Sequence, residues 1–254
     1  MTTTGPTYVE GHGLLKDRAV VITAAAGSGI GSAAARRCVE EGARVVISDR
    51  HERRLEETAS ELGVRGIACD VTDEASVQAL ISAATEELGG IDVLINNAGL
   101  GGTALVHEMT DEQWSVVLDV TLTGTFRCTR AVLAHMYERG SGVIVNNASV
   151  LGWRAQEGQA HYAAAKAGVM ALTRCVAVEA APHGVRVNAV APSLAMHANL
   201  AKVTSDELLA ELTDREAFGR AAEPWEIANA MVFLASDYSS YLTGEVLSVS
   251  SQRA

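Results

Sequence analysis

Short apolar runs alternate with longer stretches of helical periodicity along almost the whole chain. The runs are rich in Val and Ile and mostly lack alternation between apolar and polar positions, which is typical of strands buried on both faces of a sheet. They predict strands at residues 20–23, 43–48, 66–69, 93–95, 142–146, 186–189 and 245–249. The stretches between them predict helices at residues 29–41, 52–62, 74–88, 111–139, 160–182 and 224–235. Because strand and helix alternate, we expect crossover connections and one doubly wound parallel α/β sheet with helices on both faces.

The pattern changes between Pro192 and Pro224, where a loop leads into a short amphipathic helix expected at about residues 205–216. This small helical insert, about residues 193–223, is placed to act as a lid over a cleft, and the alternative is an ordinary surface excursion. No linker-like stretch divides the 254 residues, so we expect a single domain spanning residues 1–254.

Composition and charge narrow the class of protein. Hydrophobic residues make up 48% and charged residues 20% of the chain, as in ordinary soluble globules. The net charge of −11 argues against a nucleic-acid partner, which would need a basic face. The uncharged stretch at residues 19–35 contains three glycines and is at the short limit for a bilayer span, so we expect no membrane segment.

Cysteines and histidines point to neither disulfides nor a metal. The four cysteines are dispersed without a C-x-x-C pair, and the first residues lack a signal-peptide pattern. We therefore expect reduced thiols in a cytoplasmic protein. The seven histidines are also dispersed, and no metal site is predicted.

A glycine-rich turn follows the first predicted strand and opens the first predicted helix. Glycines there let a backbone approach a pyrophosphate, while the helix N-terminus offers free N–H groups and the positive end of its dipole. Such a turn alone is weak evidence, and its position after the first strand strengthens it. The residues of this turn expected to bind a dinucleotide are Ala25, Gly27, Ser28, Gly29, Ile30 and Gly31.

Acidic and small residues end the next strands. Asp49 ends the second strand, where a carboxylate is suited to accept hydrogen bonds from the adenosine ribose and to repel the additional phosphate of NADP. Arg50 beside it is suited to attract that phosphate, but we expect NAD rather than NADP. The alternative for Asp49 is a solvated loop acid. The third strand ends in Asp70 and Val71, which are placed to meet the adenine. The fourth ends in residues that permit a close approach to the cofactor, namely Asn97, Ala98 and Gly99.

Tyr162 and Lys166 lie four residues apart and therefore share one face of a predicted helix. A free tyrosine titrates near 10, and a neighbouring ammonium favours the phenolate and lowers its pKa. Tyr162 is then suited to exchange a proton with a substrate oxygen. Ser149 follows an apolar strand and is suited to hydrogen-bond the same oxygen. Taken alone, the Y-x-x-x-K spacing is more often a pair on a helix surface.

Together these features resemble the short-chain dehydrogenase/reductase family over nearly the whole chain, from Arg18 to Ser250. The motifs that carry the resemblance are the glycine-rich turn, Asp70, NNAG at 96–99, Ser149, YAAAK at 162–166 and NAVAP at 188–192. The resemblance implies a Rossmann fold and an NAD(P)-dependent enzyme that interconverts a secondary alcohol and a ketone.

The resemblance also assigns roles to individual residues. It implies that Tyr162 is the acid/base, that Ser149 stabilises the substrate oxygen, and that Lys166 lowers the pKa of Tyr162 and holds the nicotinamide ribose. Pro192 would lie near the nicotinamide. The implied assembly is a homotetramer, built through the helices around 111–139 and 160–182 and a second contact near the C-terminus.

The chain departs from the family pattern in four places. Ala25 replaces the first glycine of the turn, and Thr121 stands where the family has a catalytic asparagine that helps hold a water in a proton relay. Ser193 replaces the glycine after Pro192, and the threonine that usually follows is not evident. Residues 248–251 read Ser-Val-Ser-Ser instead of the usual Asp-Gly-Gly.

Two segments supply candidate substrate residues, after Ser149 and at the start of the insert. Their apolar members favour a bulky substrate, and their basic members are suited to a carboxylate, phosphate or thioester head, although each also has a purely structural explanation. The candidates are Val150, Trp153, Arg154, Gln156, Leu194, Met196 and His197.

Several segments, among them NNASVLGWRAQ and EAFGRAAEPWE, are similar to an actinobacterial branch of the family linked to steroid-ring catabolism. That similarity implies hydroxylated bicyclic acyl-CoA substrates, oxidised with NAD. One alternative is a 3-oxoacyl-acyl-carrier-protein reductase. Another is a non-catalytic dinucleotide-binding sensor, which only Ala25 and Thr121 support.

Overall fold

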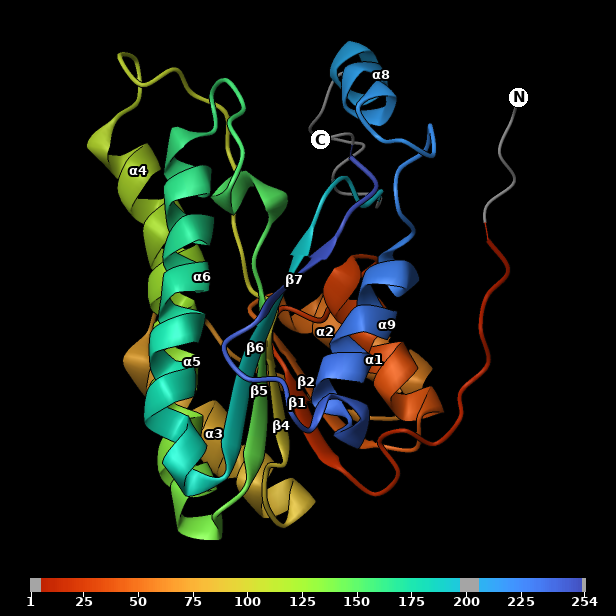
Figure 1. The fold of residues 1–254 in the computed structure, drawn as a ribbon. Coiled ribbons are helices and arrows are strands. Elements are labelled where there is room, and N and C mark those ends of the chain that lie inside the picture. The colour runs from red at the N-terminus through yellow and green to blue at the C-terminus, as the bar shows by residue number, and fades with distance from the viewer. Residues whose placement is uncertain (1–5, 197–205, 253–254) are drawn as a thin grey trace.

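A parallel sheet of seven strands forms the centre of the computed structural model, which describes residues 6–196 and 206–252 (Figure 1). The strand order is β3-β2-β1-β4-β5-β6-β7, and all neighbouring strands run parallel. The order reverses between β1 and β4, and doubly wound sheets bind ligands at the carboxyl ends of the strands at such a point. The strands are β1 (Ala19–Ile22), β2 (Arg44–Asp49), β3 (Arg65–Ala68), β4 (Val93–Asn96), β5 (Gly142–Asn147), β6 (Val185–Pro192) and β7 (Val246–Val249).

Helices cover both faces of the sheet (Figure 1). One face carries α1 (Ile30–Glu40), α2 (Glu52–Leu62) and α9 (Pro224–Ala235). The other face carries α3 (Glu74–Leu88), α4 (Asp111–Leu118), α5 (Gly124–Arg139) and α6 (Ala160–Ala180). The predicted doubly wound α/β fold is therefore confirmed. Short helices also occur as η2 (Val150–Gly152), η3 (Ala181–His183) and η4 (Asp237–Ser239).

The strands lack polar alternation because each one packs against helices on both of its faces. In β1, Val21 belongs to the core beneath α3 and α5, whereas Val20 and Ile22 belong to the core beneath α1 and α9. All three side chains are fully buried. Burying one such side chain stabilises the fold by about 1.5–3 kcal/mol, so the sheet is fixed in register from both sides.

One predicted helix is interrupted in the structure. The stretch expected as a single helix at 111–139 consists of α4, a π-helical turn η1 (Asp119–Thr123) and α5. The turn is closed by the amide of Gly124, which donates to the carbonyl of Asp119. Gly124 packs closely on Val71, since an added Cβ would lie 2.7 Å from Val71 Cγ2. The interruption thus coincides with a tertiary contact.

The insert contains α8 (Asp206–Asp214), which lies beyond the carboxyl ends of β6 and β7 (Figure 1). This helix agrees with the one expected at about 205–216, whose first predicted residue, Ser205, falls outside the described residues. The interpretation of the insert as a lid remains a prediction. Within the part of the chain that the structure describes, no helix is long and apolar enough to cross a bilayer.

Candidate active site

The turn between β1 and α1 is held in shape by Gly31. A Cβ at this position would collide with the carbonyl oxygen of Ala24 and the side-chain amide of Asn97. That amide donates to the Ala24 carbonyl at 2.9 Å, so the turn is attached to the end of β4. The close packing explains why a glycine opens the helix here.

The outer side of the same turn is open. A Cβ added at Gly27 or Gly29 would meet nothing within 4 Å. Gly29 is the N-cap of α1 and has no side chain to cap the helix, so the first amides of the helix lack a capping partner beside this space. A phosphate group suits such a helix terminus. The turn fits the pyrophosphate of a dinucleotide on geometric grounds.

Asp49 stands where the second strand reaches this turn. Its carboxylate is nearly buried and accepts hydrogen bonds from the amides of Ala26 (3.3 Å) and His51 (2.9 Å). It therefore holds the turn and also carries negative charge beside the space suited to the pyrophosphate. Arg50 is exposed and lines a shallow surface hollow together with residues 51–54.

The third and fourth strands end in residues that organise neighbouring loops. Asp70 accepts hydrogen bonds from the amide and the hydroxyl of Thr72 (2.9 and 2.7 Å), and these bonds lower the pKa of the Asp70 carboxyl. Val71 is buried beside it. Asn97 accepts a hydrogen bond from the side chain of Asn147 at 3.0 Å, which links β4 to β5. Polar groups that follow β3, β4 and β5 thus lie along the edge of the sheet formed by the carboxyl ends of the strands.

Ser149, Tyr162 and Lys166 come together at this edge. Ser149 follows β5, and its side chain is hydrogen-bonded with that of Tyr162 on α6. Lys166 is 2% exposed, and its Nζ lies 5.5 Å from the centre of the Tyr162 ring. The Nζ donates to the carbonyl oxygen of Asn147 at 2.6 Å. The expected pairing of a phenol with an ammonium is present, with a serine beside the phenol.

The protonation of the two groups is governed mainly by burial. Burial raises the pKa of Tyr162 to about 12, although the hydrogen bond with Ser149 acts in the opposite direction. Burial also lowers the pKa of Lys166 to about 8. The sequence predicted a lowered pKa for Tyr162, and in this structure desolvation shifts it the other way. Tyr162 is consequently a neutral phenol at pH 7.

Thr121 is fully buried in the π-helical turn. Its hydroxyl accepts from the amide of Leu100 at 3.0 Å and donates to the carbonyl of Leu100 at 3.3 Å. Gly99 separates this hydroxyl from Lys166, because a Cβ there would lie 3.3 Å from Lys166 Nζ and 3.9 Å from Thr121 Oγ1. Thr121 thus anchors the loop after β4 beside the lysine.

The candidate substrate residues have unequal positions. Val150 and Leu194 are buried, Gln156 and Met196 are partly buried, and Trp153 is 52% exposed. His197 lies outside the described residues. Pro192 is buried at the end of β6. Arg154 is exposed, and its guanidinium donates a hydrogen bond to the side-chain carbonyl of Gln252 near the C-terminus at 2.6 Å.

Sequence reasoning did not single out Thr23, Asn147 or Gln159, which organise the site. The Thr23 hydroxyl accepts from the amides of Asn97 and Ala98 at 3.0 and 3.2 Å. Gln159 donates to the carbonyl of Gly102 at 2.7 Å and so joins the loop before Tyr162 to the loop after β4. A polar residue that ends an apolar strand, as Thr23 and Asn147 do, was the available signal.

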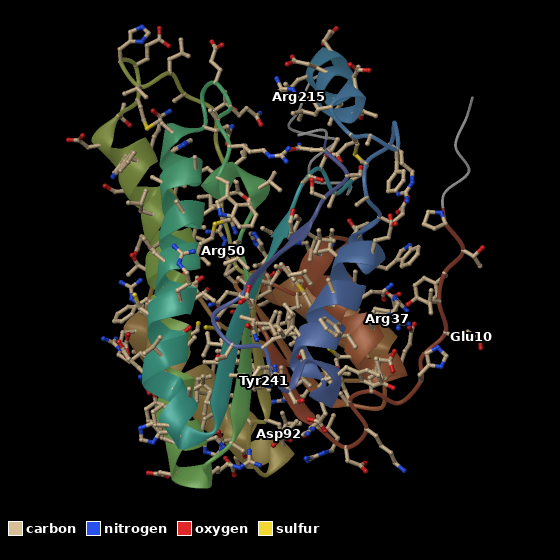
Figure 2. All side chains as sticks on the ribbon, viewed as in Figure 1. Glu10, Arg37, Arg50, Asp92, Arg215 and Tyr241 are labelled. Carbon is tan, nitrogen blue, oxygen red and sulfur yellow. The ribbon has the colours of Figure 1, made fainter. Side chains whose placement is uncertain are left out.

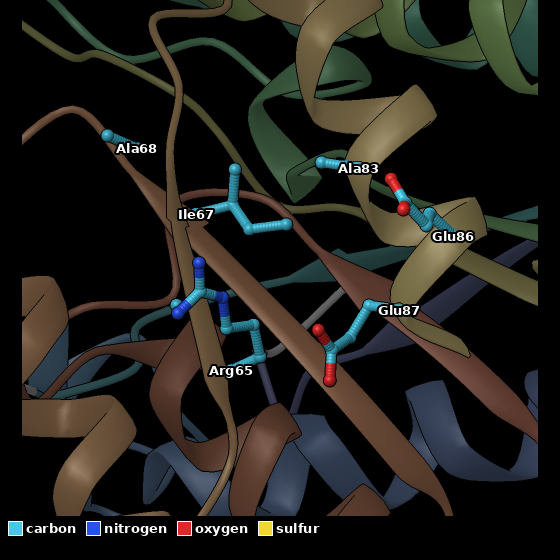
Figure 3. A pocket seen from close by; sticks show the side chains of 7 residues that line it. Arg65, Ile67, Ala68, Ala83, Glu86 and Glu87 are labelled. Carbon is cyan, nitrogen blue, oxygen red and sulfur yellow. The ribbon is translucent and has the colours of Figure 1, made fainter.

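A second hollow of about 570 Å³ lies away from this edge, between the edge strand β3 and α3 (Figure 3). Its lining is largely charged or small, and none of Ser149, Tyr162 and Lys166 contributes to it. The lining residues are Arg65, Gly66, Ile67, Ala68, Ala83, Glu86 and Glu87. Among the described residues, no group of three or more His, Cys, Asp or Glu side chains is arranged to hold a metal ion.

A phosphate cradle at the point where strand order reverses, with a tyrosine–lysine pair and a serine beside it, defines a nicotinamide-dependent oxidoreductase of the Rossmann type. The family model described as enoyl-(acyl carrier protein) reductase matches residues 24–251. The chain therefore belongs to the short-chain dehydrogenase/reductase family, as its similarity to known relatives also shows. The family assignment from sequence motifs is confirmed.

Known relatives are similar over nearly the full length. A protein of Mycobacterium tuberculosis (strain ATCC 25618 / H37Rv) named (5R,7aS)-5-hydroxy-7a-methyl-1-oxo-2,3,5,6,7,7a-hexahydro-1H-indene-carboxyl-CoA reductase is 63% identical, covering 97% of each chain. The 3-oxoacyl-[acyl-carrier-protein] reductase FabG of Vibrio cholerae is 40% identical, covering 91% of this chain and 95% of the relative. The crystal structure of a short chain dehydrogenase from Mycobacterium smegmatis is 57% identical, with a TM-score of 0.88 and 99% of each chain covered.

Proposed function

We propose that the protein interconverts a secondary alcohol and a ketone on a bulky bicyclic acyl-CoA of steroid-ring degradation, using NAD. The observation that carries the substrate class is the 63% identity to the Mycobacterium tuberculosis reductase, which extends over 97% of both chains. The exposed Trp153 and Arg154 beside the candidate site are suited to an apolar ring system and an anionic head.

We assign the proton transfer to Tyr162. In the reducing direction its phenol donates a proton to the ketone oxygen, and in the oxidising direction its phenolate takes the proton of the alcohol. Ser149 hydrogen-bonds the same oxygen and holds it beside the phenol. Lys166 carries positive charge that stabilises the phenolate as it forms. The bound nicotinamide supplies the other half of the chemistry, because it accepts or donates the hydride of the carbinol carbon.

The choice of NAD rests on Asp49. Its nearly buried carboxylate lies at the end of β2, beside the turn suited to the pyrophosphate. Negative charge there disfavours the additional phosphate of NADP. The exposed Arg50 favours the additional phosphate of NADP instead. It takes no part in the two backbone hydrogen bonds that hold the Asp49 carboxylate in place.

We also propose that the protein assembles as a homotetramer. The helices on the α4–α6 face leave large apolar side chains exposed, among them Trp114 (40%), Phe126 (40%) and Val178 (76%). Such side chains lose contact with water when the face that carries them packs against another subunit. Sedimentation at micromolar concentration tests this assembly, and a monomeric profile would contradict it.

The activity is tested by following reduced-nicotinamide absorbance with two substrate pairs. One pair is NAD with a hydroxylated bicyclic acyl-CoA, and the other is NADPH with a simple 3-oxoacyl thioester. Turnover of the first pair alone supports the proposal. In both cases Tyr162→Phe should abolish turnover but retain binding of NADH, since the phenyl ring keeps the shape and loses the proton.

The second candidate is a 3-oxoacyl-acyl-carrier-protein reductase. It is favoured by the 40% identity to the Vibrio cholerae enzyme and by the description of the matching family model. Fast turnover of the NADPH pair and none of the NAD pair would establish this alternative and would contradict the role given to Asp49.

A further inference from the structure

Glu216 is a buried carboxylate with no role in the chemistry described above. Its side chain is 1% exposed, and it follows α8 at the exit of the insert. It accepts hydrogen bonds from the hydroxyl of Ser251 at 2.8 Å and the amide of Leu194 at 3.4 Å. No cation pairs with it among the described residues. A buried charge is costly without compensating hydrogen bonds, so these two donors stabilise its position.

The two donors come from distant parts of the chain. Leu194 lies at the entrance of the insert, Glu216 at its exit, and Ser251 in the C-terminal tail, which we define as residues 250–252. One carboxylate thus joins three segments. Figure 2 shows the exit end of α8, marked by Arg215, on the side of the molecule where the strands end.

Backbone bonds reinforce the same junction. The amide of Ala217 donates to the carbonyl of Ser251 at 2.6 Å, and Glu216 pairs with Gln252 in an antiparallel bridge. The amide of Ala222 donates to the carbonyl of Leu194 at 2.8 Å. Both ends of the insert are therefore attached to each other, and its exit is attached to the tail.

The tail in turn contacts the segment between the catalytic serine and tyrosine. The side-chain oxygen of Gln252 accepts a hydrogen bond from the Arg154 guanidinium at 2.6 Å. The backbone amide of Gln252 donates to the Ser250 hydroxyl at 3.0 Å. Residues 248–251 depart from the Asp-Gly-Gly of the family, and Ser251 supplies a hydroxyl that glycine lacks. This difference from the family pattern therefore supplies the hydrogen bond from Ser251 to Glu216.

We propose that Glu216, Ser251 and Gln252 are positioning residues that fix the base of the insert against the Arg154 segment and thereby set the affinity for bulky substrates. The proposal deepens, and rests on, the proposed action on a bicyclic acyl-CoA. A small alcohol presents much less surface for contact than a bicyclic acyl-CoA. Its binding should depend little on the junction.

The test compares Ser251→Ala with Ser240→Ala, an exposed serine after η4 that serves as the matched control. Ser251→Ala removes one of the two hydrogen bonds that hold the Glu216 carboxylate, so we expect KM for the bicyclic acyl-CoA to rise roughly tenfold. We expect kcat to stay within about twofold, because the Ser–Tyr–Lys geometry is untouched. KM for a small cyclic alcohol should not change. Equal rises in both KM values, or none, would overturn the proposal.

A readout independent of activity separates this proposal from the proposed substrate. Hydrogen exchange at the amides of Leu194 and Ala217 should be faster in Ser251→Ala than in the wild type and unchanged in Ser240→Ala. If the wild type does not turn over the bicyclic thioester but exchange accelerates, the substrate assignment fails and the junction stands. If exchange is unchanged, the junction is refuted. Glu216→Gln is a second variant that keeps the shape and removes the charge, and it should also accelerate exchange at Leu194.

Discussion

The hydroxyl of Thr121 hydrogen-bonds both backbone groups of Leu100. It accepts from the amide at 3.0 Å and donates to the carbonyl at 3.3 Å. Its single proton is therefore used within the protein. Thr121→Val removes both bonds at nearly constant shape. We expect the free energy of unfolding to fall by about 1–3 kcal/mol, the cost of leaving such polar groups without partners. Urea unfolding measures the loss.

Thr121→Val also distinguishes two roles for Thr121, which are anchoring of the loop after β4 and a part in a proton relay. Thr121→Ser retains the hydroxyl and should restore the unfolding free energy. If Thr121 acts only through the loop, Thr121→Val should raise KM and leave the shape of the pH–rate profile unchanged. A shifted profile at unchanged stability would assign the threonine to the relay instead.

Gly29 and Gly31 lie two residues apart, yet an alanine should have opposite consequences at the two positions. At Gly31 the methyl group collides with Ala24 and Asn97, so Gly31→Ala should lower the melting temperature and disturb the turn. At Gly29 the methyl group enters open space at an ordinary φ of −91°. Gly29→Ala should fold as well as the wild type but bind NADH more weakly. Calorimetry and NADH titration measure the two effects, and normal NADH binding by Gly29→Ala would argue against the cradle.

The sheet was readable from the sequence because strands buried on both faces need continuous apolar runs. The run at 43–48, for example, corresponds to β2 at Arg44–Asp49. The π-helical turn was not readable, because it ends at Gly124, whose close contact with Val71 joins residues that are distant in the chain.

The same distinction applies to the site. The glycine-rich turn and the Tyr162–Lys166 spacing are local signals, and the structure brings their residues to one edge. The raised pKa of Tyr162 depends on how deeply the phenol is buried, and no local pattern records burial. The junction at Glu216 likewise joins segments that only the folded chain places together.

Asp49→Asn tests the preference for NAD with little change in shape. The variant loses the negative charge but keeps an oxygen that can accept from Ala26 or His51. We expect the ratio of kcat/KM for NAD to that for NADP to fall about tenfold, equivalent to about 1.4 kcal/mol of lost discrimination. Arg50→Gln is the matched comparison and should reduce use of NADP without affecting NAD. An unchanged ratio in Asp49→Asn would show that this carboxylate does not select the cofactor.

Alcohol oxidation should accelerate as pH rises from 7 to about 8, the range in which Lys166 still carries its charge. Burial raises the pKa of Tyr162 to about 12, so the phenolate that takes the alcohol proton is scarce at neutral pH and increases tenfold with each pH unit. Ketone reduction uses the phenol and should not show this rise. Initial rates of both directions at low substrate concentration provide the comparison. A flat oxidation profile would mean that a different group takes the proton.

Lys166 should make the stability of the protein depend on pH in a predictable direction. Burial lowers its pKa from 10.5 to about 8 in the folded protein. Between these values the unfolded chain binds more protons at this site than the folded one, so the free energy of unfolding rises with pH. The penalty of burying the ammonium is therefore greatest below pH 8 and disappears above pH 10.5. Relative to Lys166→Met, which has no charge to bury, the wild type should gain roughly 2–3 kcal/mol between pH 7 and pH 10. Urea unfolding of both proteins at each pH measures this difference, and a gap that stays constant would show that Lys166 titrates normally.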